Sequence, residues 1–257
     1  MIGFLIKKSF YDLWDNLLLI ALINLGFIAS ASIPLLLPSV LSGIPVLALL
    51  VTIAGAVWCS IYLVTAALAL QTLSNTGGLT FGDFFGGIRK SLVAGLLLSI
   101  LVIAIAYCLT AAIPFYLAAK STLGLMAAAM LFWMIVLALL TVQFFPTVKA
   151  RFEGNPRILL RRCLEIFFDN TLFSIFTALA NLVLLALSIF LAFLLPGPAG
   201  MLMFMDDAVR LRLLKYDWLK AHPEANRKRI PWEEILAEER EITGTRSLRN
   251  LIFPWKD

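Results

Sequence analysis

The sequence contains little charge. Only 14% of its 257 residues are Asp, Glu, Lys or Arg, whereas about a quarter is typical of soluble domains. Hydrophobic residues make up 61% of the chain, and the mean hydropathy is +0.94. These values exclude an ordinary soluble enzyme and a disordered protein. The net charge of +5 does not indicate a nucleic-acid partner, because the basic residues flank apolar runs instead of covering a wetted face.

Residue types that carry chemistry are also scarce. There is one histidine, His222, and the three cysteines lie far apart in the chain. Neither a catalytic Ser-His-Asp set nor a disulfide framework or cysteine metal motif fits this content. The two Gly-Gly pairs lack the Lys-Ser/Thr ending of a phosphate-binding loop. We therefore predict no enzymatic activity, no catalytic residues, no metal and no cofactor.

Five apolar runs are long enough to cross a bilayer, which requires about 20 helical residues. They contain no charged residue and comprise Leu17–Leu37, Val46–Leu70, Leu92–Ala118, Leu123–Phe145 and Thr171–Leu195. Each must be helical, because lipid offers no hydrogen-bond partner to a free backbone group. The sequence therefore predicts an all-α polytopic transmembrane bundle, with the lipid bilayer as its surroundings.

The basic residues indicate the orientation of these runs. Lys7 and Lys8 precede the first run, Arg89 and Lys90 precede the third, and the segment 149–162 before the fifth contains five more. Short loops rich in Lys and Arg stay in the cytoplasm. We therefore expect a cytoplasmic amino terminus, with the loops Gln71–Ser91 and Pro146–Asn170 on the same side.

An internal repeat precedes two of the runs. Residues 7–16 (KKSFYDLWDN) align without gaps with residues 161–170 (RRCLEIFFDN). Each copy combines a basic pair, an amphipathic helical stretch and an aromatic-Asp-Asn ending, which predicts a short cytoplasmic interfacial helix that leads into a membrane hairpin. Asp15, Asn16, Asp169 and Asn170 are candidates for a polar cluster at the inner mouth of the bundle. The alternative is that they cap the helix that follows.

A sixth crossing over residues 201–216 would complete three helical hairpins. Their tips are marked by prolines, at positions 34, 38 and 45, at 114, and at 196 and 198. The repeat and the basic tail favour this crossing, and the cost of charge in lipid opposes it. The segment carries Asp206, Asp207, Arg210 and Arg212, which are the first candidate functional residues, because an ionisable residue inside a membrane indicates function by default. Alternatively, they form an ion-paired helix end at the cytoplasmic interface.

The chain then divides into a transmembrane helical domain, residues 1–216, and a polar tail, residues 217–257, which we expect to be amphipathic and cytoplasmic. Tryptophan commonly lies at membrane interfaces. The predicted interfacial anchors are Trp14, Trp218, Trp232 and Trp255. Alternatively, the end of the tail, residues 251–257, docks on the chain's own cytoplasmic loops or on a partner protein.

Two further segments carry a resemblance to a known family. They are residues 79–90 (LTFGDFFGGIRK) and residues 144–152 (FFPTVKARF), the second followed by a basic amphipathic stretch and another span. Over roughly Phe4–Tyr216 the chain resembles the YesL-like integral membrane family of bacteria, which has no assigned biochemistry or functional residues. The resemblance implies a location in the bacterial inner membrane and a non-enzymatic accessory role beside a membrane transporter, linked to carbohydrate uptake. The alternative is a small solute or ion transporter or channel that uses the Asp206–Arg212 helix.

Overall fold

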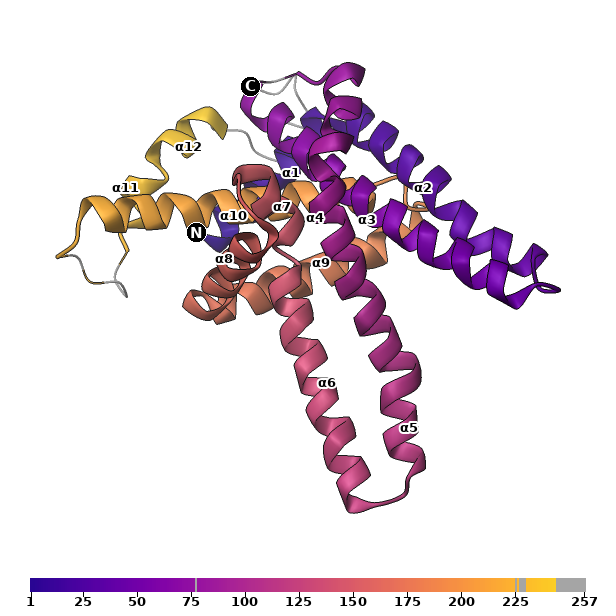
Figure 1. Cartoon of the computed structure of the whole chain (residues 1–257). Coiled ribbons are helices and arrows are strands. Elements are labelled where there is room, and N and C mark those ends of the chain that lie inside the picture. Colours follow the sequence, from indigo (N-terminus) through magenta and orange to yellow (C-terminus); the bar gives the residue numbers. More distant parts are fainter. Residues whose placement is uncertain (77, 225, 227–229, 244–257) are drawn as a thin grey trace.

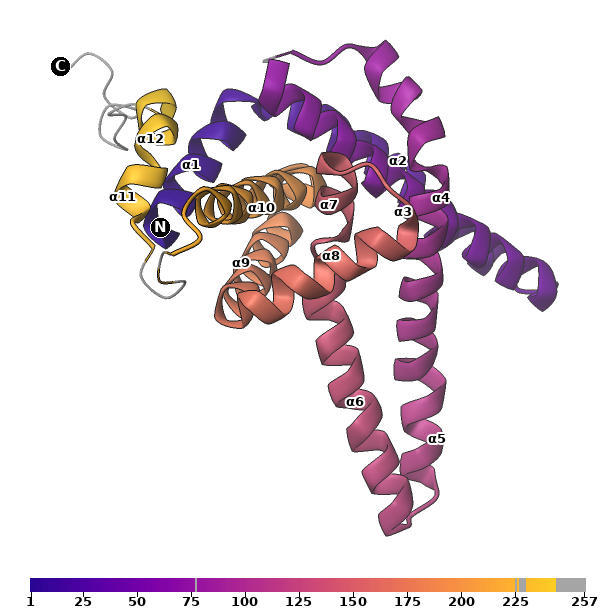
Figure 2. The same ribbon diagram turned by 60° about the vertical axis from the view of Figure 1, so that its left-hand side comes forward.

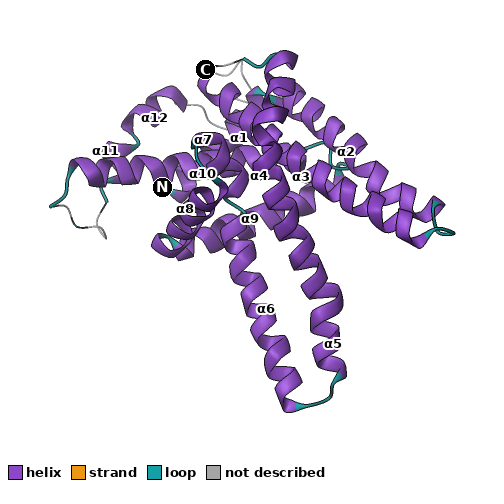
Figure 3. Cartoon of the chain, viewed as in Figure 1, coloured by secondary structure: helices purple, strands orange, loops and turns teal. Residues whose placement is uncertain are grey.

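The computed structural model describes residues 1–76, 78–224, 226 and 230–243. These residues form helices joined by short loops and contain no strand, so the predicted all-α fold is confirmed (Figures 1 and 3). The helices are α1 (Ile2–Asp15), α2 (Leu17–Val40), α3 (Pro45–Thr76), α4 (Phe81–Tyr107), the π-helix η1 (Cys108–Ala112), α5 (Ile113–Ala118), α6 (Thr122–Val142), α7 (Phe145–Arg151), α8 (Pro156–Asp169), α9 (Thr171–Phe190), α10 (Gly197–Ala221), α11 (Trp232–Ile235) and α12 (Ala237–Thr243).

Five helical segments are long and apolar enough to cross a membrane. They are Leu17–Val40, Pro45–Ser74, Gly82–Ala118, Thr122–Arg151 and Thr171–Phe190. In the most apolar stretch of each, only 17% to 22% of the residues are buried inside the protein. Outward apolar surface of this extent requires lipid or another apolar partner. The prediction of a multi-pass membrane protein with five spans is therefore confirmed.

The first two hairpins diverge from a common base. In both ribbon views α2–α3 and the pair formed by α4–α5 and α6 extend in different directions (Figures 1 and 2). The hairpin α2–α3 is close-packed at Gly55, where a Cβ atom would overlap the ring of Pro34. In the second hairpin, the π-helix η1 ends two residues before Pro114, which cannot donate a backbone hydrogen bond to the preceding turn.

The third pair, α9 and α10, is built differently. Helix α10 lies at the centre of the molecule and contacts α1, α2, α3, α7, α9 and α11. Thirteen of its 25 residues are buried. It does not have the composition of a membrane span, so the sixth crossing stays a prediction.

Asn24 of α2 fixes the turn that begins α10. The side chain is fully buried, and its Nδ2 donates to the carbonyl oxygens of Leu194 at 2.9 Å and Pro196 at 2.8 Å. Its Oδ1 accepts from the backbone N–H of Ala199 at 2.8 Å. Gly197 has a φ of 59°, and a Cβ atom there would overlap the Asn24 side chain. One polar residue in an apolar run thereby determines where α10 starts.

The structure supports the internal repeat. Helices α1 and α8 each have 14 residues and end at an Asn that breaks the helix before the next one begins. In the register that aligns Lys7 with Arg161, several equivalent positions have the same burial, although Tyr11 is buried where Glu165 is exposed. The buried pairs are Leu5/Leu159, Ser9/Cys163, Ile20/Ser174 and Ile23/Thr177, and the exposed apolar pairs are Phe10/Leu164, Trp14/Phe168, Leu18/Leu172 and Leu25/Leu179.

The described part of the tail packs against the chain itself. Leu236 is fully buried, and Trp232 packs against the core around α10. Trp14 is 47% exposed, as an interfacial anchor requires, whereas Trp232 is directed into the protein. The docking predicted for residues 251–257, and with it Trp255, lies outside the described residues and stays a prediction.

Candidate functional site

The candidate site is a series of ion pairs along α10. Asp206 is 3% exposed and forms a two-point contact with Arg151, the last residue of α7. The Arg151 Nε donates to Oδ1 at 2.7 Å and Nη2 donates to Oδ2 at 2.6 Å. Burial of a carboxylate is tolerable here because the guanidinium matches both of its oxygens.

Asp207 faces α1 instead. The Lys8 Nζ lies 3.1 Å from its Oδ1, and the Ser9 hydroxyl donates to its Oδ2 at 2.9 Å. Lys8 also pairs with Asp12 on its own helix, so one ammonium serves two carboxylates. Burial raises the pKa of the Asp207 carboxyl to about 7, and the charge of Lys8 only partly offsets this. Burial also opposes the charge on Lys8, but the carboxylates of Asp207 and Asp12 outweigh it and raise the Lys8 pKa.

Farther along α10, Arg210 and Arg212 contact different partners. Arg210 pairs with Glu239 of α12 at 2.6 Å, which attaches the tail to α10. Arg212 forms no ion pair with any residue that the structure describes, and its Nε is buried without a hydrogen bond. Its guanidinium lies 3.6 Å from the ring centroid of Phe173 and 5.5 Å from that of Trp232. Burial lowers the Arg212 pKa to about 10.

Asn170 is the polar centre of this end of α10. Its Oδ1 accepts from Arg212 Nη1 at 3.1 Å and from Lys215 Nζ at 2.9 Å, while its Nδ2 donates to the Tyr216 hydroxyl at 2.8 Å. A neutral amide oxygen thus accepts hydrogen bonds from two cations. The side chain thereby links the break between α8 and α9 to α10.

The structure brings together only part of the predicted polar set. Asp206, Asp207, Arg210, Arg212 and Asn170 all lie on or against α10, whereas Asp15 and Asp169 are exposed. The interpretation of the Asn residues as caps of the following helix is wrong, because neither makes a side-chain hydrogen bond to that helix. Instead, each Asn donates to a carbonyl four residues earlier, at 2.8 Å in the first copy and 3.3 Å in the second. They stabilise the end of the preceding helix.

Sequence reasoning missed several partners of this network and the residue that fixes the start of α10. Lys8 and Arg151 were interpreted only as indicators of topology, and Glu239 only as part of an amphipathic tail. Asn24 was not singled out, although it is the one amide in the first apolar run. That isolated polar residue was the available signal, since polar groups within membrane helices are rare and usually hydrogen-bonded.

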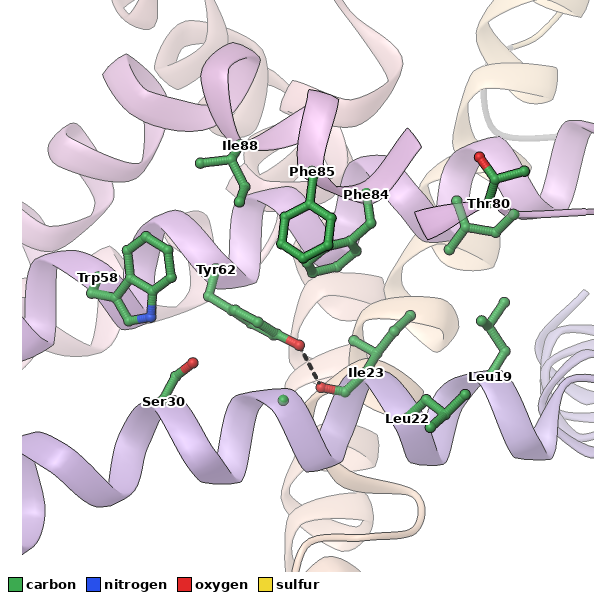
Figure 4. Close-up of a pocket in the computed structure, with 12 residues that line it drawn as sticks. Leu19, Leu22, Ile23, Ser30, Trp58, Tyr62, Thr80, Phe84, Phe85 and Ile88 are labelled. Carbon is green, nitrogen blue, oxygen red and sulfur yellow. Dashed lines mark hydrogen bonds between the residues drawn. The ribbon is translucent and has the colours of Figure 1, made fainter. Parts of the chain in front are cut away.

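Two cavities lie outside the network. The first, which we call the α2–α4 cavity, has a volume of about 420 Å³ and is bounded by α2, α3 and the start of α4 (Figure 4). The second, the vertex cleft, has a volume of about 650 Å³. It lies where the hairpins diverge, and α2, α3, α6, α9 and α10 contribute to its walls. Both linings are almost entirely apolar.

Comparisons with family models, with curated proteins and with solved structures find no match. Among the described residues there is also no group of three or more side chains that could hold a metal ion. The features of the described residues that bear on function are the network of α10 and the two cavities.

Proposed function

We propose that the chain is a non-enzymatic accessory subunit of a bacterial inner-membrane transport assembly, and that the vertex cleft receives a transmembrane helix of its partner. The observation that carries the proposal is the cleft itself, an apolar recess with walls from α2, α3, α6, α9 and α10. A role beside a carbohydrate uptake system would agree with the family resemblance of residues 79–90 and 144–152.

Two amides, Gln143 and Asn181, contribute to the lining of the vertex cleft. The Gln143 Nε2 donates to the carbonyl oxygens of Leu140 and Ser174, at 2.9 Å each. The Asn181 Oδ1 is buried and has no hydrogen-bond partner among the described residues. An unpaired buried acceptor is costly, and Ser, Thr or Asn side chains commonly supply donors between membrane helices. We therefore expect the partner helix to carry such a donor, and the Asn181 side chain to turn toward the cleft when that helix binds.

The ion pairs of α10 support one wall of the cleft. Met201, Leu202 and Met205 line it, and Asp206 and Asp207 follow on the next positions of the same helix. Their partners on α1 and α7 hold this helix against the rest of the bundle. In this proposal the charged residues position a binding face and do not themselves bind a solute.

The alternative, a transporter or channel that uses the Asp206–Arg212 helix, has less support. Such a path needs water or solute beside the charges, whereas Asp206 and Asp207 are 3% and 2% exposed and are matched by Arg151 and Lys8. A change of any measured flux in Asp206→Asn and Asp207→Asn variants that remain folded would favour the alternative.

The positions of α1 and α12 support a cytoplasmic tail. Asp207 contacts α1 through Lys8, and Arg210, one turn farther along α10, contacts α12 through Glu239. The amino-terminal helix and the described part of the tail therefore lie on the same side of the molecule. A reporter fused to the carboxyl terminus should be active only in the cytoplasm, and a periplasmic signal would contradict the three-hairpin topology.

The decisive experiment is photocrosslinking in native membranes from two positions of α6. Leu139 lines the vertex cleft, whereas Met130 does not, and both are well exposed, at 52% and 66%. A photoreactive amino acid at position 139 should give one discrete protein adduct, and the same amino acid at position 130 should give lipid adducts only. Asn181→Leu should reduce the protein adduct. Lipid adducts alone at position 139 would refute the proposal.

A further inference from the structure

We propose that the α2–α4 cavity binds an isoprenoid quinone, whose ring lies among aromatic side chains and whose carbonyl oxygens accept hydrogen bonds from Ser30 and Trp58. Three features of the cavity support this: two free donors at mid-membrane depth, the aromatic rings near them and an opening toward lipid. The site goes beyond the accessory role proposed above and is independent of the partner helix in the vertex cleft.

The Ser30 hydroxyl differs from the other hydroxyls of the membrane spans. Every other Ser or Thr inside the five spans, apart from the first and last residue of each, donates to a carbonyl three or four residues earlier. Ser30 instead points its hydroxyl toward α3, where the Trp58 indole N–H lies next to it (Figure 4). Neither donor forms a hydrogen bond with any residue that the structure describes. Because a hydroxyl in lipid normally bonds to its own helix, two free donors side by side indicate a bound acceptor.

The depth of this donor pair restricts the ligand. Ser30 lies near the middle of the span Leu17–Val40, and Trp58 lies near the middle of the span Pro45–Ser74. The hydrocarbon core of a bilayer is about 30 Å thick, so the ester and phosphate groups of a phospholipid lie roughly 15 Å from this level. The acceptor must therefore belong to a molecule that dissolves in the core itself. An isoprenoid quinone meets this requirement, because it is hydrocarbon except for ring oxygens, and its carbonyl oxygens only accept hydrogen bonds.

The walls of the α2–α4 cavity offer flat surfaces that a ring can pack against. The Tyr62 hydroxyl donates to the carbonyl oxygen of Ile23 at 2.8 Å, which fixes the Tyr62 ring across the cavity (Figure 4). Gly26 permits this approach, because a Cβ atom there would overlap the Tyr62 hydroxyl. The Phe84 ring lies against Tyr62, with the centroids 5.4 Å apart, and the Phe85 ring follows at 6.1 Å from Phe84. Aromatic rings pack in offset or edge-to-face arrangements, and a planar quinone ring can join them in the same way.

The size and the opening of the α2–α4 cavity fit such a ligand. Its volume of about 420 Å³ lies in the range of small-molecule sites, roughly 300–1,000 Å³, which are mostly apolar with a few polar groups that orient the ligand. The lining side chains of Leu22, Trp58 and Phe85 are 55%, 41% and 66% exposed, and all three lie on apolar spans. A ligand dissolved in the bilayer can therefore enter from the side, while its isoprenoid chain stays in the surrounding lipid.

The test follows the tryptophan fluorescence of the full chain in phosphatidylcholine vesicles, because a quinone in contact with an indole ring quenches its emission. The probe is a 1,4-naphthoquinone with a short isoprenoid chain. We expect a component of quenching that saturates as quinone is added and that is absent in Trp58→Phe. The matched control, Trp133→Phe, removes an indole that is 64% exposed on α6 and lines neither cavity, and it should retain the saturable component. Quenching that never saturates, or a saturable component that persists in Trp58→Phe, would overturn the proposal.

The role of the carbonyl oxygens is tested separately. Ser30→Ala removes one donor and should weaken quinone binding roughly 3- to 10-fold, the contribution of one neutral hydrogen bond. Ser32→Ala is the control, because the Ser32 hydroxyl already donates to the carbonyl oxygen of Ala29 at 2.8 Å and does not line the cavity.

A second measurement needs no variant. A naphthalene with the same isoprenoid chain but no carbonyl oxygens should compete with the quinone more than roughly 10-fold less well. Equal competition, or wild-type binding in Ser30→Ala, would mean that the cavity takes any apolar molecule, and the proposal would be wrong. Failure of the vertex-cleft crosslink would not affect it.

Discussion

The Arg151–Asp206 pair allows a quantitative test of how α10 is held. The two side chains are 12% and 4% exposed and share two hydrogen bonds. Asp206→Asn leaves a nearly buried guanidinium without a counter-charge, which typically costs about 3–5 kcal/mol. For a chain of this size, about 1 kcal/mol corresponds to a shift of roughly 2–4 °C in Tm, so we expect a decrease of about 6–20 °C.

The double variant Arg151→Met/Asp206→Leu distinguishes the loss of a pair from the loss of packing. Replacement of a buried ion pair by apolar residues of similar volume is often neutral or stabilising. We therefore expect the double variant to recover most of the Tm lost in Asp206→Asn. The assay is thermal unfolding of the detergent-solubilised protein, followed by size-exclusion chromatography of the heated samples.

An exposed pair provides the control. Arg161 and Glu165 lie on the surface of α8, with side chains 81% and 57% exposed, and such pairs contribute about 1 kcal/mol or less. Glu165→Gln should therefore change the Tm by only a few degrees. If Asp206→Asn is as mild as Glu165→Gln, the ion pair does not hold α10 and the reasoning is refuted.

Three further predictions concern other parts of the network. Because burial raises the pKa of Asp207 to about 7 from about 3.9 in an unfolded chain, the folded state binds the proton more tightly, and Tm should fall as pH rises from about 4 to 7. Asp207→Asn should remove that slope, and an equal slope in the variant would assign it to other groups. Gly197→Ala should lower the Tm, since it combines a left-handed backbone with an overlap at Asn24, whereas Gly43→Ala, which meets no atom within 4 Å, should not. Glu239→Gln should release the tail from α10 and make it more sensitive to limited proteolysis, and unchanged cleavage would mean that apolar contacts alone hold it.

The sequence predicted the spans well for a simple physical reason. The thickness of the bilayer sets the length of an uncharged run, and runs such as Leu17–Leu37 need no knowledge of tertiary contacts to be recognised. The helix end at the close of each repeat copy was also predicted, but the hydrogen bond of its Asn side chain was assigned to the wrong helix. A residue at the junction of two helices can satisfy either one, and the backbone at Asn16 and Asn170 directs the amide to the helix before it.

The partners of α10 could not be predicted in the same way. Lys8 belongs to a basic pair that local rules interpret as a topology signal, and only the packing of α1 against α10 places it beside Asp207. Asp206 and Asp207 stood out in the sequence because charge next to apolar sequence is rare, and their functional role stays a prediction. Whether such charges conduct ions, bind a ligand or stabilise helix packing depends on the residues that face them, and only the fold determines those residues. The YesL-like resemblance stays a prediction.

The contact between α1 and α10 also has a consequence for biosynthesis. Ser9 and Asp207 are 198 residues apart, so the first helix leaves the ribosome long before its partner exists. At about 5–20 residues per second, Lys8 waits roughly 10–40 seconds for its second carboxylate. During that interval Asp12 is its only acidic neighbour in this network. The position of α1 is therefore fixed only when α10 has been synthesised. In a nascent chain truncated before Asp207, α1 should remain accessible to chemical reagents that cannot reach it in the complete protein.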